Sequence, residues 1–168
     1  SLKSDNLLQP LADSLNETFA LPKDITIVTT ECGEVNAFYD ADSASIQLCY
    51  ELMDDFYRIF TEAADDPNAT DEIDAAATNA LLSTFYHELG HALIDQYHLP
   101  TTGKEEDAVD QLSAFIMIDE TKEGLKDALD GAKAFMLATE EVVSASELPF
   151  WDTHSLDMQR FFNLVCWA

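Results

Sequence analysis

Hydrophobic positions in the first third of the chain predict one helix and a small sheet. Apolar residues recur at helical spacing over residues 5–18. Three short runs that are rich in β-branched residues or bounded by turn-forming residues predict strands at residues 25–30, 35–39 and 45–49. The polar tetrad at residues 40–43, between the last two runs, is typical of a turn.

From Glu51 onward the period of the pattern becomes helical. It predicts a helix from Glu51 to near Asp65 and a longer one over residues 71–97. Further helices are expected at residues 105–120, 125–142 and 155–167. A sheet formed by the first third and followed by helices is an α+β arrangement, and the length of 168 residues fits one domain, 1–168.

Charge narrows the classes of partner. The chain has 33 Asp and Glu against 8 Lys and Arg, a formal net charge of −25, and the acids are spread along its length. Nucleic acid and anionic membranes need Lys and Arg contacts to phosphate, so the charge argues against both as partners. No apolar run approaches the roughly 20 residues of a membrane span. We expect a solvated acidic surface; the alternative is a surface that attracts a basic partner or cations.

The three cysteines, Cys32, Cys49 and Cys166, allow at most one intramolecular disulfide, with three pairings. Cys32 and Cys49 flank a hairpin-like stretch, and a bridge from Cys166 back to one of them is one expectation. Buried free thiols are the other. The cysteines lack the spacing of a zinc ribbon, so they do not form a metal cluster by themselves.

An HExxH pattern, His87-Glu88-Leu89-Gly90-His91, lies inside the longest predicted helix. Residues at i and i+4 share a helix face, so His87 and His91 can bind one cation at about 2.0–2.1 Å from each nitrogen. Glu88 can then take a proton from a water molecule on that cation. Gly90 costs about 1 kcal/mol in a helix interior, which indicates a close neighbour there. The alternative is a core helix with two incidental histidines and a solvated Glu88.

A catalytic zinc keeps three protein ligands and an open position, so a third ligand is expected. Glu106 and Asp110 are four residues apart on the next predicted helix and share one of its faces. Glu106 is the candidate metal ligand, and Asp110 is the candidate carboxylate that holds a ligand histidine through its second nitrogen. Glu105 and Val109 do not suit the same two roles. The alternative for Glu106 is a first-turn acid favoured by the helix dipole.

Four blocks of sequence resemble a known family. They are NAFYD with a following CYEL at 36–40 and 49–52, HELGHALID at 87–95, GKEEDAVDQL at 103–112 and HSLDMQRFFNLVC at 154–166. In this order they resemble a bacterial metallopeptidase family named DUF4344, and HELGHAL followed by ExxxD resembles the gluzincin branch of the zincins. The resemblance spans the chain from about Cys32 to the C-terminus. It implies a zincin-like α+β domain with a small N-terminal sheet, a long HExxH helix and further C-terminal helices.

The resemblance to gluzincins also implies residues that contact the substrate. Asn36 and Ala37 would lie on an edge strand beside the metal, where an extended peptide can pair by main-chain hydrogen bonds and Asn36 can hold a carbonyl. The alternative for Asn36 is a turn or bulge residue. His154 would be a catalytic residue that donates to the oxyanion. Its alternative is a helix-start histidine bonded to Asp152 or Asp157.

We therefore expect a zinc-dependent metallopeptidase with one zinc ion per chain, held by His87, His91 and Glu106, that acts on a peptide or protein substrate. Glu88 would be the general base. One alternative is a zincin-like module that binds metal or peptide without turnover, and another is an acidic interaction protein in which HELGH is incidental. Zinc is inferred from ligand type, and the same ligands suit other divalent ions.

Three smaller expectations complete the prediction. We expect a bacterial protein outside the cytoplasm, periplasmic or secreted, although residues 1–10 show no signal-peptide pattern. Arg160, one of two arginines, is expected to form an ion pair with a neighbouring acid. The sequence does not indicate an oligomeric state.

Overall fold

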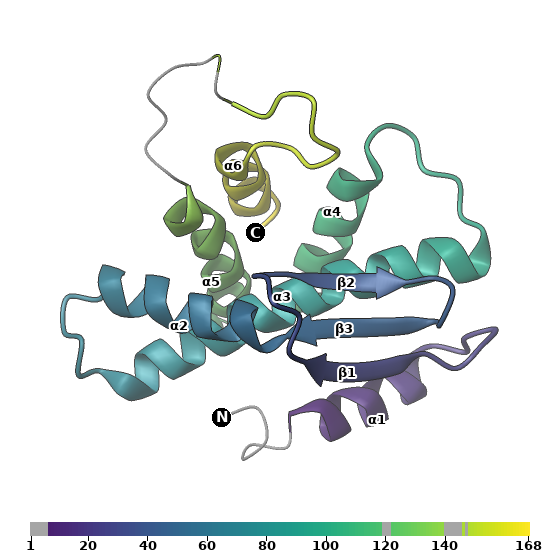
Figure 1. The fold of residues 1–168 in the computed structure, drawn as a ribbon, viewed down its shortest axis with the longest axis horizontal. Coiled ribbons are helices and arrows are strands. Elements are labelled where there is room, and N and C mark those ends of the chain that lie inside the picture. The colour runs from purple at the N-terminus through teal and green to yellow at the C-terminus, as the bar shows by residue number, and fades with distance from the viewer. Residues whose placement is uncertain (1–6, 119–121, 140–145, 147) are drawn as a thin grey trace.

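The computed structural model describes residues 7–118, 122–139, 146 and 148–168 of the chain. These residues form a small three-stranded sheet and six helices, which confirms the predicted α+β class (Figure 1). In chain order the elements are α1 Leu8–Thr18, β1 Thr26–Thr30, β2 Ala37–Asp40, β3 Ser45–Cys49, α2 Tyr50–Ala63, α3 Thr70–Tyr97, α4 Glu105–Met117, α5 Lys122–Ala138 and α6 Asp157–Trp167.

The observed bounds differ from the predicted ones by a few residues, mainly at helix ends. Helix α4 ends at Met117 rather than at residue 120, because Ile118 has an extended backbone with φ −75° and ψ 111°. Helix α6 begins two residues later than predicted, since Leu156 has a ψ of 144°. The predicted start at residue 5 and the predicted ends at residues 120 and 142 lie outside the described residues.

The sheet has the strand order β1-β3-β2, with β3 in the centre. Strand β1 is parallel to β3, and β2 is antiparallel to it. Ile46 and Leu48 of β3 are buried, and they belong to the same core as Leu81, Phe85 and Leu89 of α3. Strand β2 is therefore left at the edge of the sheet, on the side where it contacts α3.

Helix α3 is the centre of the molecule. It contacts α2, α4, α5 and the strands β2 and β3, and Figure 1 shows it running behind the sheet. Its buried residues consequently point in several directions rather than along one stripe. A second, smaller apolar cluster of Ala114, Ala132 and Leu164 joins α4, α5 and α6. The HELGH segment thus lies on the helix that packs against both the sheet and three other helices.

The structure corrects the expectation of a bridge from Cys166. Cys32 is bonded to Cys49, with a Cα–Cα distance of 5.5 Å, and Cys166 is an exposed free thiol on α6. The reason is the parallel pairing of β1 with β3, which places Thr30 opposite Cys49. Cys32 follows Thr30 by two residues and therefore lies beside Cys49. The bridge ties the segment that leads into β2 to the start of α2.

Reducing the Cys32–Cys49 disulfide should lower the free energy of unfolding by about 3 kcal/mol, because the bridge closes a loop with a sequence separation of 17 in the unfolded chain. Urea unfolding of Cys166→Ala, with and without reductant, measures this change without interference from the exposed thiol. Cys32→Ala/Cys49→Ala in the same Cys166→Ala background is the control, since reductant should not move its midpoint. Equal midpoints for oxidised and reduced Cys166→Ala would contradict the prediction.

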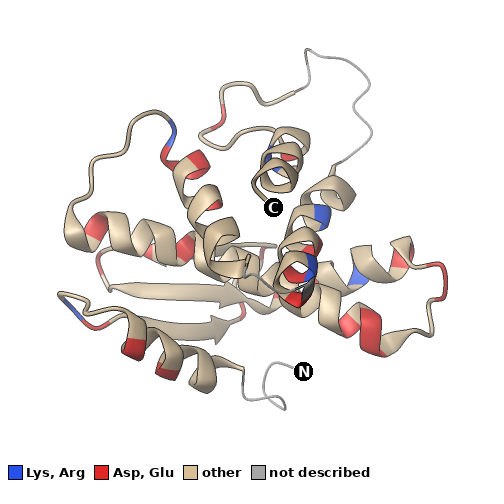
Figure 2. Cartoon of the chain, turned by 180° about the vertical axis from the view of Figure 1, so that it is seen from behind, with Lys and Arg blue, Asp and Glu red and all other residues tan. Residues whose placement is uncertain are grey.

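The acidic residues are distributed as the sequence suggested. Figure 2 shows Asp and Glu on most of the helices and in the loop between α2 and α3, while the strands carry few of them. Among the described residues, none of the helices is both long enough and apolar enough to cross a membrane.

Candidate metal centre

Helix α3 brings His87, Glu88 and His91 to one side of the molecule. The Nε2 atoms of His87 and His91 are 3.3 Å apart, as expected for imidazoles one helical turn apart on the same face. His87 and Glu88 are buried, and His91 is half-buried. The two rings can therefore present one nitrogen each to a common point.

Close packing of α3 against α4 brings carboxylates to these histidines. A Cβ atom on Gly90 would lie 2.7 Å from both Cβ and Cγ1 of Val109, which is too close for any residue but glycine. The close neighbour expected at Gly90 is thus present. Glu106 precedes Val109 by three residues and Asp110 follows it, so this contact determines where both carboxylates lie.

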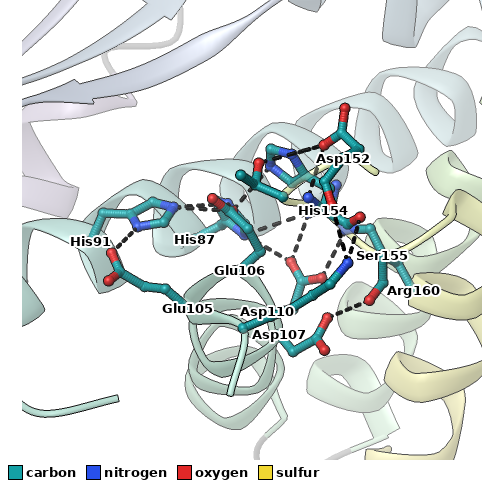
Figure 3. A network of polar contacts seen from close by, with 12 residues as sticks. His87, His91, Glu105, Glu106, Asp107, Asp110, Asp152, His154, Ser155 and Arg160 are labelled. Atoms are coloured by element: carbon teal, nitrogen blue, oxygen red, sulfur yellow. Dashed lines mark hydrogen bonds and ion pairs between the residues drawn. The ribbon is translucent and has the colours of Figure 1, made fainter. Parts of the chain in front are cut away.

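Glu106 lies at the centre of the cluster (Figure 3). Its Oε2 atom is 3.1 Å from Nε2 of His87 and 3.2 Å from Nε2 of His91. Together with the 3.3 Å between the two Nε2 atoms, these distances form a nearly equilateral triangle of three donor atoms. The three residues predicted as ligands are therefore brought together.

This donor set fits a divalent ion. Two imidazole nitrogens and one carboxylate oxygen form a ligand set that proteins use for zinc. Ligand atoms bound tetrahedrally at about 2.0–2.1 Å lie about 3.3–3.4 Å apart, and the observed triangle has edges of 3.1, 3.2 and 3.3 Å. The residues of the structure therefore need little movement to hold such an ion.

A second carboxylate orients each histidine. Nδ1 of His87 is 2.7 Å from Oδ1 of Asp110, as the sequence predicted for Asp110. Nδ1 of His91 is 2.8 Å from Oε1 of Glu105, a residue to which sequence reasoning gave no role. Because an ionised carboxylate only accepts hydrogen bonds, each Nδ1 carries a proton. Each Nε2 is then directed toward the proposed metal position.

Arg160 of α6 forms the expected ion pair, and its partner is Asp110. Its Nε atom donates to Oδ2 and its second terminal nitrogen to Oδ1, both at 2.7 Å. The side chains of Arg160 and Asp110 are only 11% and 6% exposed. A residue 50 positions away from Asp110 in the chain thus reaches the carboxylate that holds His87.

His154 reaches the cluster from the segment before α6. Its Nε2 atom is 3.0 Å from Oε2 of Glu106, and its ring stacks on that of His87 with centroids 5.9 Å apart. Donor atoms of His87, Glu106 and His154 all lie within 4.8 Å of one another. The backbone N–H of His154 also donates to Asp152 at 2.8 Å, and its Nδ1 is 3.2 Å from the same oxygen. His154 therefore makes the contact with Asp152 that was its alternative and also lies beside Glu106 in the cluster.

Glu88 lies between the histidines and the edge of the sheet. Its Oε2 atom accepts a hydrogen bond of 2.8 Å from the backbone N–H of Tyr39 in β2. This partner was not predicted, because no pattern in the sequence shows which strand residue faces α3. Burial raises the pKa of Glu88, although the nearby charges of His87 and His91 act to lower it.

The backbone of β2 shows which residues face away from the sheet. The carbonyl of Asn36 accepts from the N–H of Cys49, so by antiparallel alternation Phe38 and Asp40 pair with β3, while Ala37 and Tyr39 point outward. The side chain of Asn36 bends back, and its Oδ1 accepts from the N–H of Ala37 at 2.9 Å. Asn36, just before β2, and Ala37, its first residue, thus stand at the sheet edge, where the resemblance to gluzincins placed them.

Burial and hydrogen bonds shift the pKa values of the acids and histidines in the cluster. Hydrogen bonds from His154, His87 and His91 hold the pKa of Glu106 well below its usual range. Burial lowers the pKa of His91, but its bonds to Glu106 and Glu105 outweigh this effect and raise the pKa to about 9. Burial likewise raises the pKa of Asp110, and the bonds from Arg160 and His87 reverse this and bring it to about 2. A bound cation would take the place of protons on the imidazoles.

These residues line one cleft of about 810 Å³. Its walls include Asn36, Ala37 and Tyr39 from β2, and His87, Glu88 and His91 from α3, with Glu106 and His154 beside them. The volume lies in the range of small-ligand sites and can accept part of an extended peptide. Glu88, the candidate ligands and the edge of β2 are therefore accessible from the same cleft.

Fold and site together define an α+β protein with a candidate metal centre in its cleft. The chain belongs to the family described as "DUF4344: Putative metallopeptidase", whose model matches residues 1–168. The resemblance found from four blocks is confirmed and covers the whole chain. The family description points to a peptidase that works with a metal ion on a peptide or protein substrate. Comparison with curated proteins and with solved structures found no match.

Proposed function

We propose that the protein is a zinc-dependent metallopeptidase that hydrolyses peptide bonds with Glu88 as general base. The observation that carries this proposal is the triangle of donor atoms from His87, His91 and Glu106, with the Glu88 carboxylate in the same cleft. A zinc ion held by these residues would lower the pKa of a water molecule and polarise a peptide carbonyl.

Glu88 is suited to move a proton. Burial raises its pKa above that of an ordinary glutamate, which makes the ionised carboxylate a stronger base. The hydrogen bond from Tyr39 N–H fixes one carboxylate oxygen. The proton taken from water would later be given to the leaving amine, since the same group can act as base and then as acid.

His154 is proposed to stabilise negative charge that develops on the substrate oxygen. Its Nε2 atom already lies at the cluster, 3.0 Å from Glu106, and the side chain is 44% exposed, so it can turn toward a bound carbonyl. The backbone contact with Asp152 anchors the segment that carries it. A donor placed where charge develops contributes more in a cleft than in bulk water.

The edge of β2 is proposed to hold the substrate backbone. The N–H groups of Ala37 and Tyr39 already donate to Asn36 and Glu88, so an extended peptide would add there through the outward carbonyls of these two residues. Oδ1 of Asn36 accepts from Ala37, and Nδ2, which donates one N–H to Glu34 at 3.5 Å, has a second N–H for a substrate carbonyl. We further propose that the protein works outside the cytoplasm, an assignment supported by the Cys32–Cys49 disulfide, because such bonds persist in oxidising compartments.

Metal analysis and a peptide-library assay test the function together. The purified protein should hold about one zinc ion per chain, because the cluster offers three converging ligands. Cleavage should disappear with a chelator and return on addition of one equivalent of zinc. Zinc binding without cleavage would identify a metal- or peptide-binding module instead, and a chain that binds no divalent ion would overturn the metal centre.

A further inference from the structure

Arg160 makes contacts that reach beyond an ordinary ion pair. Its guanidinium donates hydrogen bonds of 2.7 Å to both oxygens of Asp110. Its terminal nitrogen is also 3.5 Å from Nδ1 of His87. Figure 3 shows the side chain extending from α6 toward Asp110 and His87. A bidentate bond of this kind fixes the plane of a carboxylate as well as its position.

The same oxygen of Asp110 serves both partners. Oδ1 accepts from Arg160 and lies 2.7 Å from Nδ1 of His87. Nδ1 of His87 lies closer to this oxygen than to Arg160, at 2.7 Å against 3.5 Å, and an ionised carboxylate only accepts, so Nδ1 carries the proton and donates it to Asp110. This leaves Nε2 as the nitrogen that faces Glu106, at 3.1 Å.

A third helix keeps Arg160 in this orientation. The guanidinium carbon lies 3.9 Å from the centroid of the Phe135 ring on α5, which is close enough for a cation–π contact. His87, Asp110, Phe135 and Arg160 thus come from α3, α4, α5 and α6. His87 on the central helix is connected to α6 through two side-chain contacts, His87–Asp110 and Asp110–Arg160, and the Phe135 ring supports the second of them.

The burial of this pair argues for a role other than stability. Burying two charges has a desolvation cost that their attraction often only offsets, so a buried ion pair is weak evidence of stabilisation. By contrast, groups that hold a metal-ligating histidine commonly affect metal affinity by about 10–100-fold. The contact of Glu105 with His91 offers a comparison within the same site, since Glu105 is 43% exposed.

We propose that Arg160 is a positioning residue for the metal centre. It holds Asp110 so that His87 keeps its proton on Nδ1 and presents Nε2 to the ion. The proposal rests on the metal site of the proposed function and adds to it a residue from the C-terminal helix. Arg160 touches neither substrate nor ion in this role; it acts through Asp110.

Zinc affinity tests the proposal independently of turnover. Arg160→Gln should weaken zinc binding, measured by competition with a chromogenic chelator, by about 10-fold or more, within the range for partners of metal ligands. Arg160→Lys keeps the charge but loses the planar guanidinium group, so its zinc affinity should lie between those of wild type and Arg160→Gln. The matched control is Arg58→Gln, which removes the same charge from an exposed ion pair on α2 and should leave the affinity unchanged.

The protonation site of His87 gives a second readout that needs no metal. In ¹⁵N histidine spectra of the zinc-free protein, at a pH where its imidazoles are neutral, His87 should be protonated on Nδ1 in wild type. Arg160→Gln should convert it to a mixture of both tautomers. Phe135→Leu, which removes the ring contact but keeps the ion pair, should change the tautomer less than Arg160→Gln does.

The outcomes separate this inference from the proposed function. A folded Arg160→Gln with wild-type zinc affinity and an unchanged His87 tautomer would overturn the positioning role and leave the hydrolytic mechanism standing. If Arg160→Gln does not fold, the same two measurements on Arg160→Lys decide, and wild-type values there overturn the role. Cleavage that survives loss of the Glu88 carboxylate would instead overturn the mechanism and leave the positioning role intact.

Discussion

Glu88→Gln is expected to reduce peptide cleavage by about 10²–10⁴-fold, the usual contribution of a general base, while one zinc ion per chain stays bound. The amide keeps the shape of the side chain and still accepts the hydrogen bond from Tyr39 N–H, so the cleft is preserved. It cannot take a proton from water. Initial rates on a fluorogenic peptide, together with metal content, measure the two effects separately.

Glu72→Gln is the matched control, because it removes one carboxylate from the exposed first turn of the same helix. Its cleavage rate should equal that of wild type. The mechanism would be wrong if Glu88→Gln cleaved peptides at the wild-type rate. A loss of activity accompanied by loss of zinc would point to a structural role for Glu88 instead.

Although Glu88→Gln should lose activity, its free energy of unfolding should not fall. Burial raises the pKa of Glu88 in the folded protein, so the unfolded state releases the proton more readily and ionisation disfavours the fold as pH rises. Above the folded pKa, Glu88→Gln should therefore be at least as resistant to urea as wild type. A catalytic group that weakens the fold is common at sites selected for activity.

The part of the site that could be predicted is the part set by helix geometry. His87 and His91 meet because they are four residues apart on α3, and Glu106 and Asp110 share a face of α4 for the same reason. The helix predicted from the long periodic segment also begins within one residue of the observed start of α3 at Thr70. Local periodicity was sufficient for each of these elements.

The remaining features depend on how elements pack, which one sequence does not reveal. Glu105 reaches His91 only because of the crossing of α3 over α4 that the Gly90–Val109 contact permits. The Cys32–Cys49 bridge follows from the parallel pairing of β1 with β3. Local spacing gives neither a helix crossing nor a strand order, so a non-local partner cannot be chosen from it.

Glu106→Gln is expected to lower zinc affinity by more than about 100-fold, beyond the effect typical of residues that only support a ligand. The substitution removes a negative charge that contacts His87, His91 and His154 together, and a neutral amide oxygen is a poor zinc ligand. Peptide cleavage should be lost along with the metal. Chelator competition gives the affinity, and excess zinc should restore little of the activity.

Glu105→Gln makes the sharpest comparison, since it places the same change on the adjacent residue. Glu105 contacts Nδ1 of His91, on the side of the ring away from the cluster, and it is 43% exposed, so its loss should weaken zinc binding by only about 10-fold. The pKa of His91 should fall from about 9 in both variants, because both carboxylates help to raise it. Both variants should thus change the charge around His91, but only the loss of a metal ligand should also cause the larger loss of zinc affinity. If Glu105→Gln released the zinc and Glu106→Gln retained it, the ligand would be Glu105 and the assigned roles of the two neighbouring acids would be reversed.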